Sequence, residues 1–449
     1  MNTDNLDTIV AIATARGEGA ISIIRLSGSD SLDLAKQITN KNTFHPRIAT
    51  LCKVFDISDK TLIDEVIVIF FENPNSFTGE NIVEIQCHGG IAVTNLILDQ
   101  LLKLGARVAN PGEFSKRAFE NGKIDLTKAE AIAQMISSKS EEAVKLLARQ
   151  LNGELKLFVE KIREDLIFAL ACSEVGIDYA EEDLPPDLTQ AIHQKLEHTS
   201  HILKQSIDIS KRRDGMIDGY KICIIGKPNV GKSSILNSLL NYERAIVSDI
   251  AGTTRDTIEE NIKIGTHLIK IVDTAGIRSA NDEIEKIGIE RSKSAMEEAK
   301  IIVCVFDGSR KFDDEDSQIL DLINSAQEKE IICVLNKSDL QQQFDFSKLQ
   351  NFIQISSKTT ISPLISKITD ILDANSDSDN VTLISKRQIQ CVENCLGNLE
   401  NAIDLLQELQ LELFSYHIKE AITNISDISR PFDNDQMLDV MFNSFCLGK

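Results

Sequence analysis

A glycine-rich segment in the middle of the chain has the residue types of a phosphate-binding loop. It reads GKPNVGKS from Gly226 to Ser233 and lies between the apolar run KICII and an amphipathic stretch. Such a loop folds its backbone N–H groups around phosphates at the N-terminus of a helix. Lys232 is expected to reach the β- and γ-phosphates, and the Ser233 hydroxyl to bind Mg²⁺. Because a strand is expected before the loop and a helix after it, we interpret the segment as a nucleotide-binding P-loop.

A second motif, NKSD, indicates which base the nucleotide carries. It follows the predicted strand EIICVLN and begins at Asn336. Asp339 can accept both N–H donors of guanine's Watson–Crick edge, which adenine does not offer in that arrangement. Asn336 is expected to hold the base edge and to tie this loop to the P-loop, while the stem of Lys337 packs on the base. The segment ISSK, residues 355–358, fits the last nucleotide loop. At this distance after a P-loop, NKSD indicates GTP.

Two further segments complete the predicted GTP site. In IVDTAG, Asp273 ends a predicted strand and is positioned for Mg²⁺ through water, and Gly276 can close on the γ-phosphate. In GTTRD, Thr253 and Thr254 lie where a mobile loop would complete the Mg²⁺ shell in the GTP state. The residues predicted to contact GTP are Asn229, Val230, Gly231, Lys232, Ser233, Ser234, Ser248, Asp249, Ile250, Ala251, Gly252, Thr253, Thr254, Asp273, Thr274, Ala275, Gly276, Asn336, Lys337, Asp339, Ser356, Ser357 and Lys358.

The catalytic group for hydrolysis is not obvious from these motifs. Many GTPases place a Gln directly after the glycine of DTAG to orient the attacking water, but Ile277 stands here and cannot hydrogen-bond. The carbonyl of Asn229 could hold a monovalent cation beside the phosphates, which would stabilise transition-state charge as an arginine finger does. The less favoured alternative is that Asn229 only caps a turn. For the water-positioning group the residues leave three candidates open: Asp282, Glu283 and Glu285.

These loops require a scaffold, and 449 residues are enough for two to four domains. Short apolar runs alternate with amphipathic stretches around the P-loop, which predicts a parallel α/β sheet. The stripe from Ile389 through Val392, Leu396, Leu399 and Ile403 to Leu406 has the spacing of a bundle-facing helix. The sequence therefore predicts a multidomain protein, an α-helical bundle with a P-loop GTPase domain inserted in it. Its segments are an α+β domain at 1–123, helices at 124–215, the α/β GTPase domain at 216–378, and helices at 379–449.

The composition excludes several classes of protein. The formal net charge of −21 argues against a large exposed nucleic-acid footprint. No apolar run approaches the roughly 18–20 residues that a bilayer crossing needs, and the N-terminus lacks the features of a secretory signal. We therefore expect a cytoplasmic protein without a membrane partner. The nine cysteines have no metal-binding spacing, so neither a zinc site nor a disulfide framework is expected.

The chain ends in FCLGK, with Cys446 fourth from the end. The position imitates a prenylation box, but Lys is not among the usual last residues of that signal, and nothing polybasic precedes it. Cys446 could be a buried structural residue, since Phe442 and Phe445 are near in sequence. Alternatively, the Lys449 ammonium could favour a thiolate at Cys446, because cations lower the pKa of cysteine.

Taken together, the motifs resemble those of one family, the tRNA-modification GTPases MnmE (TrmE). The resemblance covers the whole chain and rests on SFTGENIVEIQCHGG, PGEFSKRAFENGK, GKPNVGKS, DIAGTTRD, DTAGIR, EKIGIERS, NKSD and the terminal NSFCLGK. It implies a homodimer formed through the N-terminal domain, which is folate-binding-like and takes a tetrahydrofolate derivative. It also implies a FAD-dependent MnmG/GidA-like partner in a heterotetramer or larger assembly. Together they would add a carboxymethylaminomethyl or aminomethyl group to the 5-position of the wobble uridine of certain tRNAs.

The resemblance also implies roles for residues of the GTPase domain. It implies a K⁺ ion at the P-loop, with Asn229 as a side-chain ligand. The loop from Ser248 through Ile250 to Thr253 would wrap this ion. Glu285 matches the residue that orients the attacking water, and hydrolysis would depend on K⁺ and be activated when two GTPase domains dimerise. The Mg²⁺ ligands implied are Ser233 and Thr254.

In the N-terminal domain, the resemblance assigns folate-contacting positions to Arg25, Glu84 and Lys123, with Lys449 contributing from the C-terminus. A carboxylate such as Glu84 can bind the guanine-like edge of a pterin bidentately, and cations suit the carboxylates of folate. Without the resemblance, Arg25 and Lys123 would be interpreted as solvated surface residues. The terminal tail is implied to lie at this site, which makes Cys446 a candidate catalytic residue, with a positioning role as the alternative.

Two other expectations follow from the residues. His88, in CHGG, is expected to be a satisfied core histidine rather than a pocket residue. The strongest alternative function is that of a ribosome-assembly GTPase of the Era/Der class. Those proteins should carry an RNA-binding module, often basic, and no folate-like domain, which fits this acidic chain poorly. A third interpretation is a scaffold protein that is switched by GTP and does not act as an enzyme. Such a protein would hydrolyse GTP only slowly, and the rate would not depend on the monovalent cation.

Overall fold

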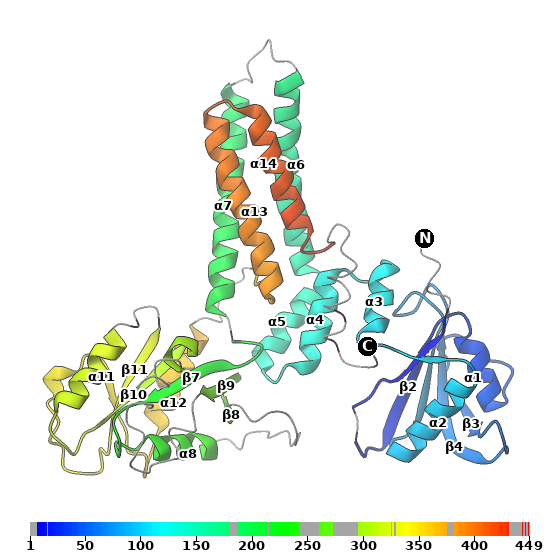
Figure 1. Cartoon of the computed structure of the whole chain (residues 1–449), viewed down its shortest axis with the longest axis horizontal. Coiled ribbons are helices and arrows are strands. Elements are labelled where there is room, and N and C mark those ends of the chain that lie inside the picture. Colours follow the sequence, from blue (N-terminus) through cyan, green and yellow to red (C-terminus); the bar gives the residue numbers. More distant parts are fainter. Residues whose placement is uncertain are drawn as a thin grey trace. The chain divides into compact units, whose positions relative to one another are not determined.

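The computed structural model of the chain describes residues 7–15, 17–178, 186–213, 215–242, 260–272, 295–324, 326, 329–374, 381–430, 442, 445 and 448. Its contacts divide the chain into two compact units. The first comprises residues 1–133 and 423–449, and the second comprises residues 134–422 (Figure 1). Among the described helices, none combines the length and the apolar character that a bilayer crossing needs.

The first unit contains a six-stranded sheet in the order β3-β4-β5-β2-β1-β6. Along β2, alternate side chains are buried, which is the pattern of a strand with one face on a core. Helices α1 and α2 cover that face (Figure 1). Their residues Leu34, Ile38, Ile97 and Leu101 belong to the core cluster beneath them. The elements are β1 Ile9–Ile12, β2 Ile21–Ser27, α1 Ser31–Thr39, β3 Thr50–Phe55, β4 Leu62–Phe71, β5 Ile82–His88, α2 Ile91–Lys103, β6 Arg107–Val108, α3 Glu113–Glu120 and the larger part of α4 Leu126–Ser137.

Residues close to the C-terminus belong to this first unit. Phe442 is buried against Leu126 and Ala129 of α4, and Phe445 packs beside it. The glycine at 448 has a positive φ, and a Cβ there would collide with the Ile12 carbonyl at the end of β1. Gly448 therefore lies next to the first strand of the N-terminal sheet.

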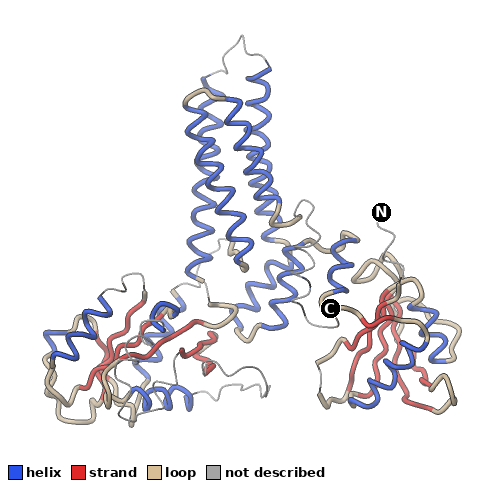
Figure 2. The backbone as a smooth tube through the Cα atoms, in the orientation of Figure 1, coloured by secondary structure: helices blue, strands red, loops and turns tan. Residues whose placement is uncertain are grey.

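The second unit contains a helical bundle in which α6, α7, α13 and α14 run side by side (Figure 2). Helix α13 packs along α7, although the whole second sheet lies between them in sequence. The Ser173 hydroxyl of α6 meets the Ser415 hydroxyl of α14 at 2.8 Å. The α/β segment therefore interrupts a helical bundle. The helices are α5 Glu141–Leu151, α6 Glu154–Asp178, α7 Pro186–Arg212, α13 Lys386–Gln407 and α14 Leu411–Ser426, whose last turn belongs to the first unit.

The core-facing stripe of α13 differs from the predicted one. Val392, Leu399 and Leu406 are buried as expected, but the other buried positions are Cys395, Ala402 and, at the start of the helix, Gln388. The predicted stripe positions Ile389, Leu396 and Ile403 are only half-buried. Small side chains let neighbouring helices approach closely, so the centre of the contact runs through Cys395 and Ala402, and the bulkier residues flank it.

The second sheet has the order β12-β11-β10-β7-β9-β8. Neighbouring strands are parallel except for the β8–β9 hairpin. Strand β10 is buried along its whole length, as expected of a central strand covered on both faces. The elements are β7 Tyr220–Ile225, α8 Lys232–Tyr242, β8 Glu260–Ile264, β9 His267–Val272, β10 Ile301–Asp307, α11 Asp314–Asn324, β11 Glu330–Asn336, the 3-10 turn η1 Phe346–Lys348, β12 Phe352–Gln354 and α12 Ser362–Asp373.

These two sheets and the helical bundle agree with the predicted multidomain class. The four segment bounds and the folate-binding character of the first unit stay predictions. The topology of the second sheet brings the predicted nucleotide loops together. The carboxyl ends of parallel strands meet at one edge, so the loops that follow β7, β10, β11 and β12 gather there.

Candidate nucleotide site and a second cluster in the N-terminal unit

The P-loop runs from the end of β7 to the start of α8, as the sequence predicts. Two of its glycines are required by close packing. A Cβ at Gly226 would collide with the Val305 carbonyl, and one at Gly231 with the Asn336 amide; both glycines have positive φ. Asn229 also has a left-handed backbone, with φ of 62°. The loop therefore has a conformation that only these small or amide side chains adopt easily.

Lys232 and Ser233 begin helix α8. The Lys232 ammonium donates to the carbonyls of Gly226 (2.6 Å) and Lys227 (2.7 Å). Burial lowers the pKa of Lys232 below its ordinary value. Ser233 and Ser234 are exposed in the first turn of the helix. A hydroxyl placed there is a suitable hard ligand for Mg²⁺, next to a helix N-terminus that favours phosphate.

The NKSD loop is fixed to the P-loop by two side chains. Asn336 is buried, and its amide donates to the Val230 carbonyl (2.9 Å), while its Oδ1 accepts the Ser357 N–H (3.0 Å). The Lys337 ammonium donates to the Asn229 carbonyl (2.9 Å) and pairs with Asp307 (2.6 Å). The loops after β7, β10, β11 and β12 are thus joined in one cluster.

Asp339, the residue predicted to recognise the base, lies at the surface of this cluster. Asp339 is exposed, and a hydrogen bond with the Ser356 side chain lowers the pKa of its carboxyl. Ser356 is buried, and its hydroxyl also accepts the Lys358 N–H at 3.4 Å. An ionised, accessible carboxylate at this position can accept two N–H groups from a base.

The structure thus brings together every described residue predicted for the nucleotide: Asn229, Val230, Gly231, Lys232, Ser233, Ser234, Asn336, Lys337, Asp339, Ser356, Ser357 and Lys358. The other predicted residues lie outside the described part of the chain. They are Ser248, Asp249, Ile250, Ala251, Gly252, Thr253, Thr254, Asp273, Thr274, Ala275, Gly276, Glu285, Cys446 and Lys449.

In the first unit, two of the predicted folate-contacting residues pair with each other. Arg25 of β2 stands opposite Glu84 of β5 in the sheet register. Its Nε and Nη2 both donate to Glu84 Oε1, at 3.0 and 2.8 Å. The guanidinium also lies about equally far from the rings of Phe77 (6.0 Å) and Phe114 (5.8 Å). The pair is partly exposed, with 22% and 16% of the two side chains accessible.

The third predicted residue, Lys123, follows α3 and is exposed. Its stem packs against Gly79, where a Cβ would lie 3.0 Å from Lys123 Cε. Gly79 belongs to the loop that carries Phe77, so Lys123 and Arg25 contact the same loop. This loop, residues 72–81, connects β4 to β5.

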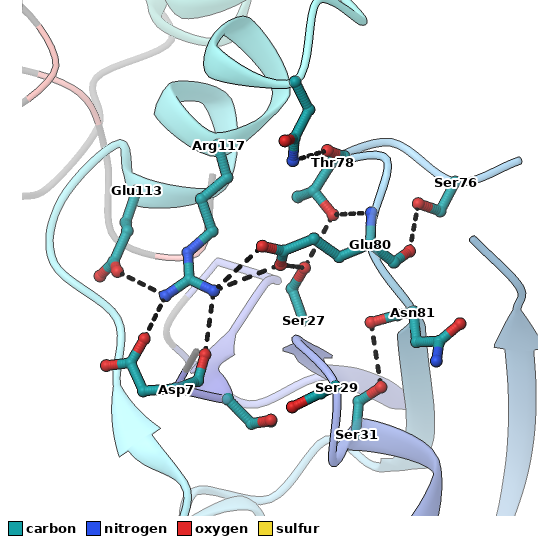
Figure 3. Close-up of polar contacts among 12 residues, drawn as sticks. Asp7, Ser27, Ser29, Ser31, Ser76, Thr78, Glu80, Asn81, Glu113 and Arg117 are labelled. Atoms are coloured by element: carbon teal, nitrogen blue, oxygen red, sulfur yellow. Dashed lines mark hydrogen bonds and ion pairs between the residues drawn. The ribbon is translucent and has the colours of Figure 1, made fainter. Parts of the chain in front are cut away.

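Behind this loop lies an ion-pair network that the sequence did not suggest (Figure 3). Arg117 of α3 is 1% exposed and is surrounded by three carboxylates. Its Nη2 contacts Asp7 (2.6 Å) and Glu113 (3.1 Å), and its Nη1 contacts Glu80 (3.2 Å). Glu80 in turn accepts the Ser27 hydroxyl at 2.7 Å. The network joins the loop 72–81 to α3, β2 and the start of the described chain.

A second arginine shares two of these carboxylates. Arg107 of β6 contacts Asp7 and Glu113, each at 2.6 Å. Burial alone would raise the pKa of Glu113, but hydrogen bonds from Arg107 and from the Asn110 N–H outweigh it, so this pKa lies below its ordinary range. The only available sequence signal was the spacing of Glu113 and Arg117, which is that of an i,i+4 helix pair.

The expectation for His88 was wrong. Its side chain is 74% exposed, and its Nδ1 contacts Asp64 at 2.7 Å. The same carboxylate accepts the His88 backbone N–H at 2.9 Å. His88 is the last residue of β5, so its side chain lies at the strand end rather than over the core.

The fold and the loop cluster define the class of this protein. A P-loop between a parallel strand and a helix, tied to an NKSD loop through a buried asparagine, is the arrangement of a P-loop GTPase. The family description "GTP-binding protein TrmE N-terminus" matches residues 8–123, and "MnmE helical domain" matches residues 126–446. The chain belongs to the tRNA modification GTPase MnmE family.

Relatives named tRNA modification GTPase MnmE match over the full length. The protein of Aliarcobacter butzleri is 59% identical over 443 residues, and that of Sulfurimonas denitrificans 57% identical over 444, each covering 99% of both chains. The protein of Nitratiruptor sp. is 53% identical and covers 100% of both chains. A solved structure of Aquifex aeolicus Era bound to GDP and AlF₄⁻ is 25% identical, covers 40% of this chain and 66% of its own, and has a TM-score of only 0.26. That likeness adds nothing to the family assignment.

Proposed function

We propose that this chain hydrolyses GTP as part of tRNA modification, together with a FAD-dependent MnmG/GidA-like partner. The pair would add a carboxymethylaminomethyl or aminomethyl group to the 5-position of the wobble uridine of certain tRNAs. One observation carries the proposal. A P-loop tied to an NKSD loop through buried Asn336 occurs in a chain whose relatives, 48–59% identical over nearly their full length, are named tRNA modification GTPase MnmE.

In GTP hydrolysis, Lys232 and the N-terminus of α8 would bind the phosphates, and Asp339 would select guanine. Ser233 would hold Mg²⁺ together with Thr254, and the ion would neutralise charge on the phosphates. Glu285 would orient the attacking water. These assignments follow the motif positions in this chain, and the exposed Ser233 at the helix N-terminus supports the metal-binding part.

The residues described at the P-loop also fit a monovalent cation. The backbone carbonyl of Asn229 already accepts a hydrogen bond from the Lys337 ammonium. The side chain of Asn229 is exposed, so its amide carbonyl is the oxygen suited to K⁺. Ser248, Ile250 and Thr253 would supply the remaining contacts. A cation held there would stabilise charge that develops on the phosphates during hydrolysis.

The first unit would bind a tetrahydrofolate derivative and form the homodimer. The partly exposed Arg25–Glu84 pair fits a ligand with a guanine-like edge and acidic groups, because Arg25 orients Glu84 through one oxygen only. Lys123 would add positive charge for the folate carboxylates, and Lys449 would do so from the C-terminus. Cys446 would act in the modification chemistry or position the ligand. The site of action would be the cytoplasm, where tRNA is modified.

The first test is steady-state GTP hydrolysis by the purified protein in KCl and in NaCl at equal ionic strength. A large advantage of KCl, abolished in Asn229→Ala and Glu285→Gln, is the expected result. Equal rates in the two salts would contradict the cation proposal while leaving GTP binding intact. Mass spectrometry of tRNA from a deletion strain should then show loss of the wobble-uridine modification. Restoration of the modification by the wild-type chain and not by Glu285→Gln would connect hydrolysis to modification. If the deletion strain keeps the modified wobble uridine, the tRNA proposal is refuted.

A further inference from the structure

The second residue of the P-loop, Lys227, is buried between two carboxylates of a distant segment. Its side chain is 7% exposed. The ammonium contacts Asp313 Oδ2 at 2.6 Å and Asp316 Oδ2 at 2.8 Å. Asp313 precedes helix α11 and Asp316 lies in its first turn, about 90 residues further along the chain than Lys227. Neither aspartate belongs to any of the nucleotide motifs.

The two carboxylates are held firmly by the start of α11. The Asp316 N–H donates to Asp313 Oδ1 at 3.1 Å, and the Asp313 N–H donates to Asp316 Oδ2 at 3.2 Å. This reciprocal arrangement resembles a capping box, which fixes both side chains at a helix N-terminus. The ammonium of Lys227 therefore meets a rigid pair of acceptors rather than two mobile surface carboxylates.

The contact between Lys227 and Asp316 is also strongly buried, whereas Asp313 is 53% exposed, so it is the Asp316 contact that is costly to break. Asp316 is 2% exposed, and among the described residues its other oxygen, Oδ1, is buried without a hydrogen bond. Lys227 is therefore its main compensating charge. Replacing a buried ion pair with apolar residues is often neutral for stability, whereas removing one partner is strongly destabilising. Stability alone thus gives no reason for a charged pair at this place.

The backbone of Lys227 connects this anchor to the phosphate-binding part of the loop. Its carbonyl accepts the Lys232 ammonium at 2.7 Å. Two residues further on, Asn229 is held by Lys337, and Val230 by Asn336. The first half of the P-loop therefore has one anchor of its own, on α11, while the second half is anchored on the NKSD loop.

We propose that Lys227 is a positioning residue for GTP hydrolysis: its ion pair with Asp313 and Asp316 fixes the first half of the P-loop so that Lys232 and Asn229 are aligned for the phosphates and for the monovalent cation. The inference rests on the proposed function of this site. It adds helix α11 to the elements that determine nucleotide and cation affinity.

The test compares Lys227→Met, which keeps the stem and removes the charge, with Lys227→Arg, which keeps the charge. The readouts are the affinity for a fluorescent GDP analogue and the KCl concentration that gives half-maximal hydrolysis. In Lys227→Met, GDP affinity should fall about tenfold and half-maximal hydrolysis should need about tenfold more KCl, because small displacements of positioned groups have effects of this size or larger. Lys227→Arg should restore both quantities to near the wild-type values.

Lys221→Met is the matched control, since it removes another lysine of the same domain, whose ammonium pairs with Glu298 at 2.6 Å in an exposed position. It should leave GDP affinity and the KCl requirement unchanged. If Lys227→Met is folded and both quantities stay within about twofold of the wild type, the inference is wrong. If Lys227→Met does not fold, Asp313→Asn decides, because Asp313 is half exposed and its loss leaves the Asp316 contact in place. Asp313→Asn should change both quantities in the same direction, and an unchanged variant would overturn the inference.

The experiment distinguishes a failure of the Lys227 inference from a failure of the proposed function. Failure of the wild-type chain to bind the GDP analogue would refute the GTPase proposal itself. Hydrolysis by the wild type that is equal in KCl and NaCl would remove only the cation proposal. The comparison of GDP affinities would still decide whether Lys227 positions the P-loop.

Discussion

The ion-pair network around Arg117 gives the most direct quantitative prediction for the N-terminal unit. Arg117→Met removes the guanidinium and keeps an unbranched apolar side chain of similar reach. Asp7 and Glu113 would keep their contacts with Arg107, at 2.6 Å each. Glu80 would lose its arginine and keep the Ser27 hydroxyl. One partly buried carboxylate, that of Glu80, is therefore left without its cation, rather than all three.

Removing one partner of a buried ion pair typically costs about 3–5 kcal/mol. Because Arg107 remains, the lower end of that range, about 3 kcal/mol, is expected for Arg117→Met. For a unit of this size, such a loss lowers Tm by about 6–12 °C. The loop 72–81 should open first, since Glu80 joins it to α3.

Differential scanning calorimetry of the full chain measures this change. GDP raises the transition of the unit that binds it, so the transition that GDP does not move belongs to the N-terminal unit. Hydrogen exchange of residues 76–84 should also become faster in Arg117→Met. The matched control is Lys116→Met on the same helix. The Lys116 side chain is 32% exposed and its ammonium lies 3.9 Å from Glu120, so this substitution should cost at most about 0.5 kcal/mol. If the two variants unfold within about 1 °C of each other, the network does not stabilise the unit as argued.

Three further predictions concern nucleotide binding, catalysis and pH. Asn336→Ala removes the buried amide that joins the P-loop to the NKSD loop. GDP affinity should fall about tenfold or more, because each lost hydrogen bond contributes about 1 kcal/mol and leaves its partner unpaired. Titration with a fluorescent GDP analogue measures this change, and an affinity equal to that of the wild type would refute the prediction. Glu285→Gln should lower kcat for GTP about a hundredfold with GDP affinity unchanged, as expected for a group that orients water; a parallel loss of GDP affinity would indicate a structural role instead. The pKa of Glu113 is lowered in the folded state, so its contribution to stability is present above the ordinary Glu pKa of about 4.3 and is lost as the pH falls below it. The Tm of the N-terminal unit should therefore decrease below about pH 4.3, and it should decrease less in Glu113→Gln.

The nucleotide loops could be predicted from the sequence because each is a contiguous motif at the end of a strand. The P-loop and NKSD carry their chemistry within a few residues, and parallel strands bring such loops to one edge of a sheet. The tie from Asn336 to the P-loop follows from the same logic. The partners of Lys227 could not be predicted, since Asp313 and Asp316 lie in an acidic run that is equally typical of an exposed helix N-terminus.

The N-terminal unit shows a second limit of sequence interpretation. Arg25 and Glu84 were assigned separately, but only strand register makes them a pair, and register cannot be deduced from one strand alone. Arg25 was interpreted as surface when the resemblance was set aside, yet it is mostly buried between two aromatic rings. Lys123 fits the surface interpretation, because it is exposed. The difference between them depends on long-range packing.

The three lysines around the P-loop have different electrostatic environments, and this difference bears on how an acidic protein binds a polyphosphate. Lys227 contacts Asp313 and Asp316, and Lys337 contacts Asp307. Burial opposes the charge of Lys227, but hydrogen bonds with its two aspartates raise its pKa. The described contacts of Lys232 are instead two backbone carbonyls, which carry no net charge. The carboxylates of the β10–α11 segment therefore neutralise the two lysines that support the loop, and the charge of Lys232 stays available for the phosphates that we propose it binds.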